Sequence, residues 1–170
     1  AGDVHGANRR AKAVSELREL LRGSSAQRLV VQAAALCREK RLTEDDRIAM
    51  YWSFFLSAFP FVREAWTVMG RLGRLGPQFS SKALVQRLSE TYGGGRAVHV
   101  SIEEVLGMAR DWGVVIMDKP GFYHLAPRRT IGKDAQRLLL ASLCMANDPP
   151  VYPMDHFADE LALFPFRLRL

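Results

Sequence analysis

The chain has 170 residues, of which 48% are hydrophobic and 25% charged, and this balance argues against an intrinsically disordered protein because it supplies enough apolar surface for a core. No apolar run approaches the roughly 18 residues that a membrane span needs, and the first residues lack the pattern of a secretion signal, so we expect a cytoplasmic protein. The net charge of +6 permits binding to a polyanion.

The positive charge is unevenly distributed. Lysine and arginine number ten against seven acidic residues in residues 1–60, eleven against six in residues 61–133, and three against five in residues 134–170. The excess therefore lies in the middle of the chain, which indicates that this part faces the polyanion.

The first 60 residues are expected to form a helical bundle. Residues 8–23 have apolar side chains at helical spacing and a basic face, which is either a second phosphate-binding surface or a solvated face. Ser24 or Ser25 caps a second helix that ends near residue 40. Thr43, followed by three acidic residues, starts a third helix that is apolar nearly all round and is expected at the centre of the fold.

Pro60 separates this helix from the next one, predicted over residues 61–75. Glycines at positions 70, 73 and 76 weaken the helix and indicate close packing against another helix. Ser80 or Ser81 caps a further helix to about Tyr92, and three consecutive glycines then break the chain.

A helix followed by a hairpin is predicted over residues 101–126. Ser101, with two acidic residues behind it, is typical of a helix start, and an apolar stripe runs from there to Trp112. Residues 113–126 alternate like two paired strands around a Pro-Gly turn.

The end of the chain is expected to brace the rest. Residues 132–146 form a strongly apolar helix, and residues 151–170 offer a short helix near 154–163 and an extended tail. The predicted fold is mainly α, with seven or eight helices and one hairpin. It comprises a helical bundle (1–60), a three-helix and hairpin unit (61–133) and an extension that packs on both (134–170).

The order of three helices and a hairpin over residues 61–133 resembles the winged helix-turn-helix superfamily. In that family the third helix enters the major groove and the hairpin contacts the backbone or minor groove, so the resemblance implies binding to double-stranded DNA. A solvated basic loop is the alternative for the hairpin. Side chains with the charge and reach for phosphate contacts lie on and around these elements. They are Arg96, His99, Arg110, Lys119, Tyr123, His124, Arg128, Arg129, Lys82 and Arg87.

The predicted third helix is too acidic for a usual groove reader. Its exposed positions carry three acids and one base, with two acids in the expected first turn. We therefore expect phosphate contacts with weak sequence preference. The alternative is a protein-interaction subunit of a larger complex that does not bind DNA directly. Its docking residues would be Glu103, Glu104, Phe164 and Phe166. The tail phenylalanines either dock on a partner or pack back on the core, and we favour packing back.

Motifs of enzymes are absent from the sequence: it contains no HExxH, CxxC, Walker-type glycine loop or GxSxG. Acidic residues around His156 favour a polar helix face over a metal site. Cys37 and Cys144 are expected as two buried free thiols, with a disulfide as the alternative. We expect a non-enzymatic protein without catalytic residues, cofactor, metal or small-molecule substrate.

A second resemblance rests on residues 60–66 (PFVREAW) and residues 111–115 (DWGVV). These segments are similar to BrxA-type accessory proteins of bacteriophage-exclusion (BREX) systems, which are all-helical, of similar length and carry a helical DNA-associated domain. The resemblance implies an accessory role in bacterial phage defence or regulation. Such proteins tend to carry basic residues on the later helix, where this chain has Glu103 and Glu104, so no DNA-reading residue is transferred.

Overall fold

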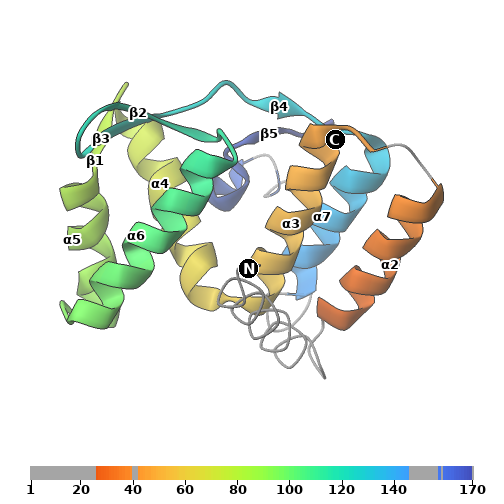
Figure 1. Ribbon diagram of the computed structural model, residues 1–170, viewed down its shortest axis with the longest axis horizontal. Helices are drawn as coiled ribbons and strands as arrows, with labels where there is room; N and C mark the ends of the chain where they lie inside the picture. Colours follow the sequence, from red (N-terminus) through yellow and green to blue (C-terminus); the bar gives the residue numbers. More distant parts are fainter. Residues whose placement is uncertain (1–25, 40–41, 146–156, 158, 170) are drawn as a thin grey trace, which may run out of the picture.

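The computed structural model describes residues 26–39, 42–145, 157 and 159–169 (Figure 1). Within these residues the fold is mainly helical, with six α-helices and a small three-stranded antiparallel sheet that includes a hairpin. The predicted mainly α architecture with a hairpin is confirmed at this level. The helix predicted over residues 8–23 lies outside the described residues.

Three helices pack together on one side of the molecule (Figure 1). They are α2 (Ala26–Glu39), α3 (Glu44–Ala58) and α7 (Lys133–Met145). The first turn of α3 is held by a reciprocal cap, in which the Thr43 hydroxyl accepts from the Asp46 N–H and the Asp46 carboxylate accepts from the Thr43 N–H. Such a cap satisfies two backbone donors that the helix leaves free, which explains the start of α3 at this point.

The other side is built on α4 (Pro60–Leu75), whose first residue is the proline that ends α3. A proline fits the first turn of a helix because its missing N–H would have no partner there. The chain continues through β1 (Phe79–Ser80), α5 (Ser81–Tyr92), α6 (Arg96–Asp111), β2 (Val115–Lys119) and β3 (Phe122–Leu125). The sheet order is β1-β3-β2, so the short strand before α5 pairs with the hairpin that follows α6.

Helix α6 begins five residues earlier than the sequence predicts. Gly95 is its extended N-cap residue, and its carbonyl accepts from the N–H groups of Val98 and His99. The predicted start at Ser101 is therefore wrong. A glycine cap has no side-chain signature, whereas a serine followed by two acids has a strong one, and here that serine lies inside the helix.

The chain end packs back onto α4. It contains the 3-10 helix η2 (Leu161–Leu163) and β5 (Phe166–Arg167), and β5 pairs in parallel with β4 (Arg129–Thr130). Of the helix expected near 154–163, residues 157, 159 and 161–163 are in 3-10 conformation, and residues 154–156 and 158 lie outside the described part.

Aromatic side chains join the two sides. The Trp52 and Trp66 rings stack with centroids 3.5 Å apart, and Phe164 and Phe166 meet Trp52 edge to face. The Trp52 indole N–H donates to the Ala162 carbonyl at 2.9 Å, which fixes η2 over α3. The burial of each aromatic side chain stabilises the fold by about 2 kcal/mol.

Two glycines of α4 mark close approaches, as predicted. A Cβ on Gly70 would lie 2.2 Å from the Leu161 carbonyl oxygen, and one on Gly73 would lie 2.3 Å from the Leu125 side chain. The neighbours are a 3-10 helix and a strand, not the helix that was predicted. Gly76 makes no comparable approach.

Candidate nucleic-acid interface

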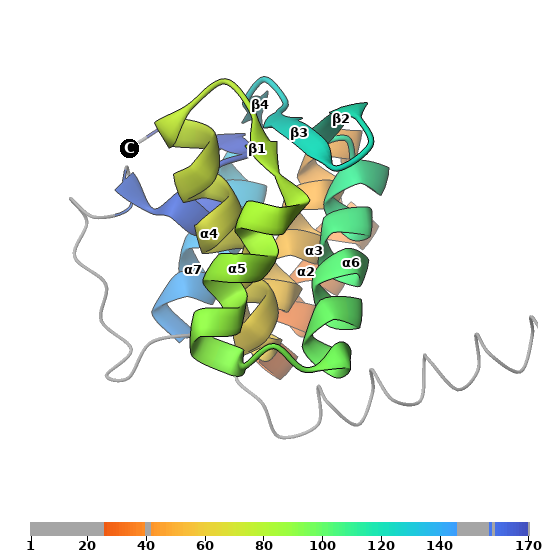
Figure 2. The same cartoon turned by 90° about the vertical axis from the view of Figure 1, so that its left-hand side faces the viewer.

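The hairpin and the start of α5 form one corner of the molecule (Figure 2). The Ser81 N–H donates to the Gly121 carbonyl at 2.9 Å, which ties the first turn of α5 to the hairpin turn. Gly121 has a φ of 80°, a conformation that a residue with a Cβ adopts only under strain. This bond places Lys82 and Lys119, both exposed, at the same corner.

The tip of the hairpin carries a cation above an aromatic ring. The Lys119 ammonium lies 4.5 Å from the centroid of the Phe122 ring, and Phe122 is 40% exposed. A cation held on an exposed ring keeps three donors available to a phosphate. Sequence reasoning selected Lys119 but missed Phe122, whose exposure depends on the register of the hairpin.

Tyr123 and His124 do not extend this surface. Tyr123 is 7% exposed and packs on Phe79, its register partner on β1, because alternate side chains of β3 face the core. His124 lies 2.8 Å from the Asp118 carboxylate, which also accepts from the Gln78 amide at 2.9 Å. The hairpin therefore holds an acid beside the predicted histidine.

The exposed face of α6 is mixed in charge. Its first turn carries Arg96 and His99 and no acid. Glu103 and Glu104, which were expected in the first turn, are exposed in the second and third turns instead, and Arg110 lies beside Asp111 at the far end. The N-terminal end of α6 is thus better suited to an anion than the sequence indicated, since the helix dipole is also positive there.

Helix α5 contributes one cation besides Lys82. Arg87 is exposed and lies 3.6 Å from Glu90 one turn later, with both side chains more than half exposed. Such surface pairs contribute little to stability and separate readily, so Arg87 can reach a phosphate.

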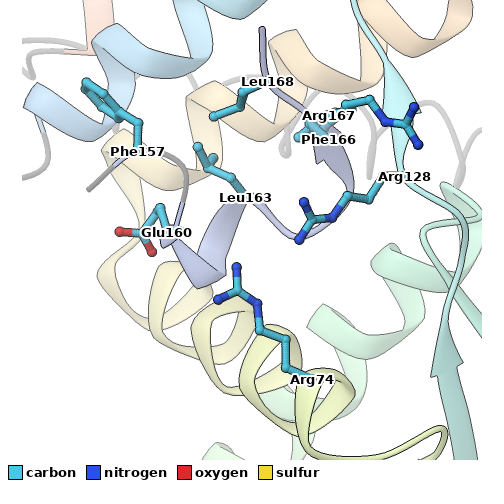
Figure 3. A pocket seen from close by; sticks show the side chains of 8 residues that line it. All are labelled: Arg74, Arg128, Phe157, Glu160, Leu163, Phe166, Arg167 and Leu168. Carbon is cyan, nitrogen blue, oxygen red and sulfur yellow. The ribbon is translucent and has the colours of Figure 1, made fainter. Parts of the chain in front are cut away.

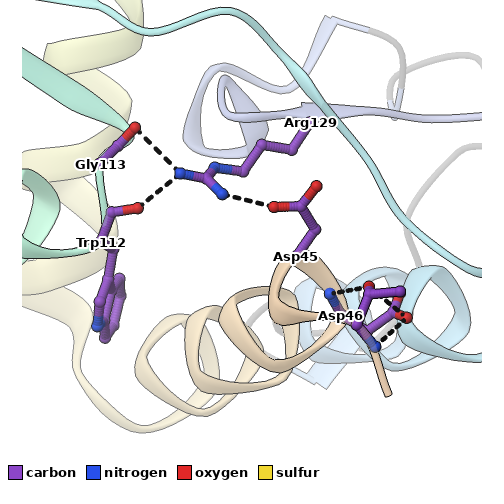
Figure 4. A network of polar contacts seen from close by, with 6 residues as sticks. Asp45, Asp46, Trp112, Gly113 and Arg129 are labelled. Atoms are coloured by element: carbon purple, nitrogen blue, oxygen red, sulfur yellow. Dashed lines mark hydrogen bonds and ion pairs between the residues drawn. The ribbon is translucent and has the colours of Figure 1, made fainter. Parts of the chain in front are cut away.

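Arg129 has a different environment from the other predicted cations (Figure 4). Its guanidinium forms an ion pair with Asp45 at the start of α3 and donates to the carbonyls of Trp112 and Gly113 at 2.8 and 3.2 Å. Its side chain is 23% exposed. It connects α3 to the turn between α6 and β2.

Asp46 completes a second polar junction beside it. Its carboxylate accepts from the Gly132 N–H at 2.7 Å and so joins the start of α3 to the start of α7. Burial raises the pKa of Asp46, but hydrogen bonds from Gly132 and Thr43 outweigh this effect and leave its pKa below the ordinary value.

Arg128, the residue before Arg129, points elsewhere. It lines a pocket together with Arg74 from the last turn of α4 and Arg167 from β5 (Figure 3). In Figure 2, α6 and the β5 segment lie on opposite sides of α4. The structure therefore separates Arg128 from the cations of α5, α6 and the hairpin, and sequence reasoning missed Arg74 and Arg167.

Of the four residues predicted to dock a partner protein, two are buried and two are exposed. Phe164 and Phe166 are 3% and 2% exposed, so the tail packs back and these side chains offer no docking surface. Glu103 and Glu104 are exposed. Glu104 lines an apolar groove of about 480 Å³ between α6 and the α3–α4 junction, whose apolar walls include Phe55, Phe59 and Met108.

The cysteines are free, as predicted, but neither is fully buried. Cys37 is exposed and Cys144 partly buried, and both are free. Among the described residues, no group of three His, Cys, Asp or Glu side chains could hold a metal ion, and no helix is long and apolar enough to cross a membrane. Asp155 and His156 lie outside that part of the chain.

No protein-family model, curated protein or solved structure matches this chain.

Proposed function

We propose that residues 60–125 form a winged helix-turn-helix that binds double-stranded DNA mainly through its phosphate backbone. The order α4, β1, α5, α6, β2, β3 supports this, because β1 joins the hairpin sheet and α5 and α6 lie side by side against α4 (Figure 2). In this arrangement α6 is the helix that faces the groove, and the β2–β3 hairpin is the wing.

One observation carries the proposal. The cations of the first turn of α6, the first turn of α5 and the hairpin tip are exposed, and among the described residues Lys82, Arg96 and Lys119 make no ion pair. Exposed cations without an ion-pair partner are available to phosphates, and phosphate contacts position a protein on a duplex without reading its sequence.

The acids of α6 set the kind of binding. Glu103 and Glu104 occupy the middle of the face that would read bases, and carboxylates are repelled by the phosphates that flank a groove. We therefore infer shallow docking with weak sequence preference. An accessory role in bacterial defence or regulation remains a proposal that rests on the resemblance of residues 60–66 and 111–115.

The test is a fluorescence anisotropy titration of the full chain with two unrelated duplexes over a salt series. With three to four phosphate contacts, log K should fall against log salt with a slope of about −3, and the duplexes should bind within about threefold of each other. Absence of duplex binding at the lowest salt would refute the proposal.

A second candidate function is a protein-interaction subunit, and the apolar groove beside α6 favours it. Three phenylalanines and Met108 line the groove, and Glu104 is its acidic residue. These features fit an amphipathic helix of a partner protein that presents apolar side chains beside a basic one.

Site-specific photocrosslinking from position 108 tests this candidate, with position 86 on the exposed face of α5 as the control. A crosslink specific to position 108, mapped by mass spectrometry to an amphipathic basic segment of another protein, would support it. A crosslink to residues 1–25 of the same chain, or equal labelling from both positions, would contradict it.

A further inference from the structure

The side of α4 that faces away from α6 holds a pocket of about 300 Å³ (Figure 3). Its rim is formed by three segments that are distant in the sequence: the end of α4, the chain before β4, and the η2–β5 tail. The fold brings them together because η2 packs closely along α4 at Gly70 and because β5 pairs with β4. The pocket is therefore part of the packed structure.

Three arginines line this pocket, one from each segment: Arg74, Arg128 and Arg167. The guanidinium groups of Arg74 and Arg128 are turned toward the pocket, and that of Arg167 points to the side (Figure 3). All three are exposed, and within the described part of the chain none has an ion-pair partner. Two guanidinium groups across one pocket repel each other, and a bound anion removes that repulsion.

The acid of the pocket, Glu160, forms no ion pair with these three arginines. Glu160 lines the opposite wall and caps η2, with one carboxylate oxygen accepting from the Ala162 N–H at 3.0 Å. The floor is apolar, formed by the buried side chains of Leu163 and Phe166 with Leu168 beside them. This distribution fits a ligand that has an anionic group at the mouth of the pocket and an apolar or planar group against its floor.

We propose that this pocket binds the phosphate group of a small phosphorylated ligand. Arginine forks donate paired hydrogen bonds to phosphate oxygens, and two forks from different directions suit a tetrahedral group better than a planar carboxylate. The pocket volume is at the lower end of the range for small-molecule sites. Its position away from α6 and the hairpin makes it independent of the proposed duplex contacts.

The test is a calorimetric titration of the full chain with inorganic pyrophosphate in a phosphate-free buffer at constant ionic strength. The double variant Arg74→Gln/Arg128→Gln removes both forks, and Arg71→Gln/Arg47→Gln is a control with the same loss of charge at exposed sites outside the pocket. Thermal melting of each variant without ligand verifies folding.

The wild-type chain should bind pyrophosphate at one saturable site, and the double variant should bind about tenfold more weakly or not at all, while the control stays within about twofold. Lack of saturable binding by the wild type, or equal weakening in both variants, would overturn the proposal. A parallel titration with duplex DNA identifies the source of the phosphate. Unchanged duplex affinity in the double variant supports a small ligand, and a loss as large as the pyrophosphate loss assigns the pocket to nucleic acid instead.

Discussion

The two sides of α4 differ in how they use charge. On the side of α5, α6 and the hairpin, basic residues alternate with acids, and two of them lie beside a carboxylate: Arg87 beside Glu90 and His124 beside Asp118. On the side of η2 and β5, three arginines surround one pocket with a single acid. The net charge of a sequence segment therefore does not predict where a charged surface lies, because the fold determines which basic side chains lie beside acidic ones.

Arg128 and Arg129 show the same contrast within one dipeptide. Successive residues of an extended chain point in opposite directions, so one arginine faces the pocket and the other reaches Asp45 and the turn after α6. Their sequence gave no reason to separate them, and both were predicted as phosphate ligands.

The largest expected effect on stability comes from substitutions at the close contacts of α4 with η2 and β3. Gly70→Ala places a methyl group against the rigid backbone of η2 and should lower the free energy of unfolding by about 3 kcal/mol. Gly73→Ala meets only the Leu125 side chain, which can change rotamer, and should cost about 1 kcal/mol. Urea denaturation measures both.

Gly107→Ala in α6 is the matched control for these variants. Apart from its chain neighbours and the backbone of its own helix, no atom lies within 4 Å of its added Cβ, so higher helix propensity should stabilise the chain by about 0.5 kcal/mol. If Gly70→Ala were as stable as this control, η2 would not pack on α4 as described.

A smaller difference in stability is expected between variants of the neighbouring residues Arg128 and Arg129. Arg129→Gln removes the ion pair to Asp45 and leaves two carbonyls without their donor, so the free energy of unfolding should fall by about 2 kcal/mol. Arg128→Gln, at an exposed site without an ion-pair partner among the described residues, should change it by less than about 0.5 kcal/mol. Equal losses in the two variants would contradict the different environments assigned to them.

Asp46, which lies next to the Arg129 partner Asp45 at the start of α3, makes the stability of the fold depend on pH. Because the folded pKa of Asp46 lies below its unfolded value, its contribution to stability is full above the unfolded pKa of about 4 and is lost as the pH falls through the folded pKa. Asp46→Asn should therefore cost about 1 kcal/mol at pH 7 and flatten the loss of stability below pH 4. Denaturation midpoints between pH 7 and pH 3 test this, and an unchanged acid profile would show that other carboxylates dominate it.

Much of the fold follows from local patterns. Thr43 with three acids, Pro60, the Ser80 cap and the Pro-Gly turn each predict an element boundary that the structure has, because each acts through its own backbone geometry. The start of α6 could not be found this way, since Gly95 caps without a side chain. The burial of Phe164 and Phe166 followed from favouring packing over docking for an apolar tail.

The candidate site was less predictable, because it depends on tertiary contacts. Tyr123 packs on Phe79 only because β1 pairs with β3 and places these two residues opposite each other. Arg74 joins Arg128 and Arg167 only because the tail folds back along α4. The spacing of residues within one segment cannot predict contacts between segments that are far apart in the sequence.

The central claim is that duplex DNA binds on the side of α6 and the hairpin. The most direct test compares the salt dependence of duplex binding in two triple variants that lose equal charge: Lys82→Ala/Arg96→Ala/Lys119→Ala on that side, and Arg74→Ala/Arg128→Ala/Arg167→Ala on the other. The first should reduce the magnitude of the slope of log K against log salt by about 3, and the second should leave it unchanged within about 0.5. An equal reduction in both, or a larger one in the second, would contradict the claim.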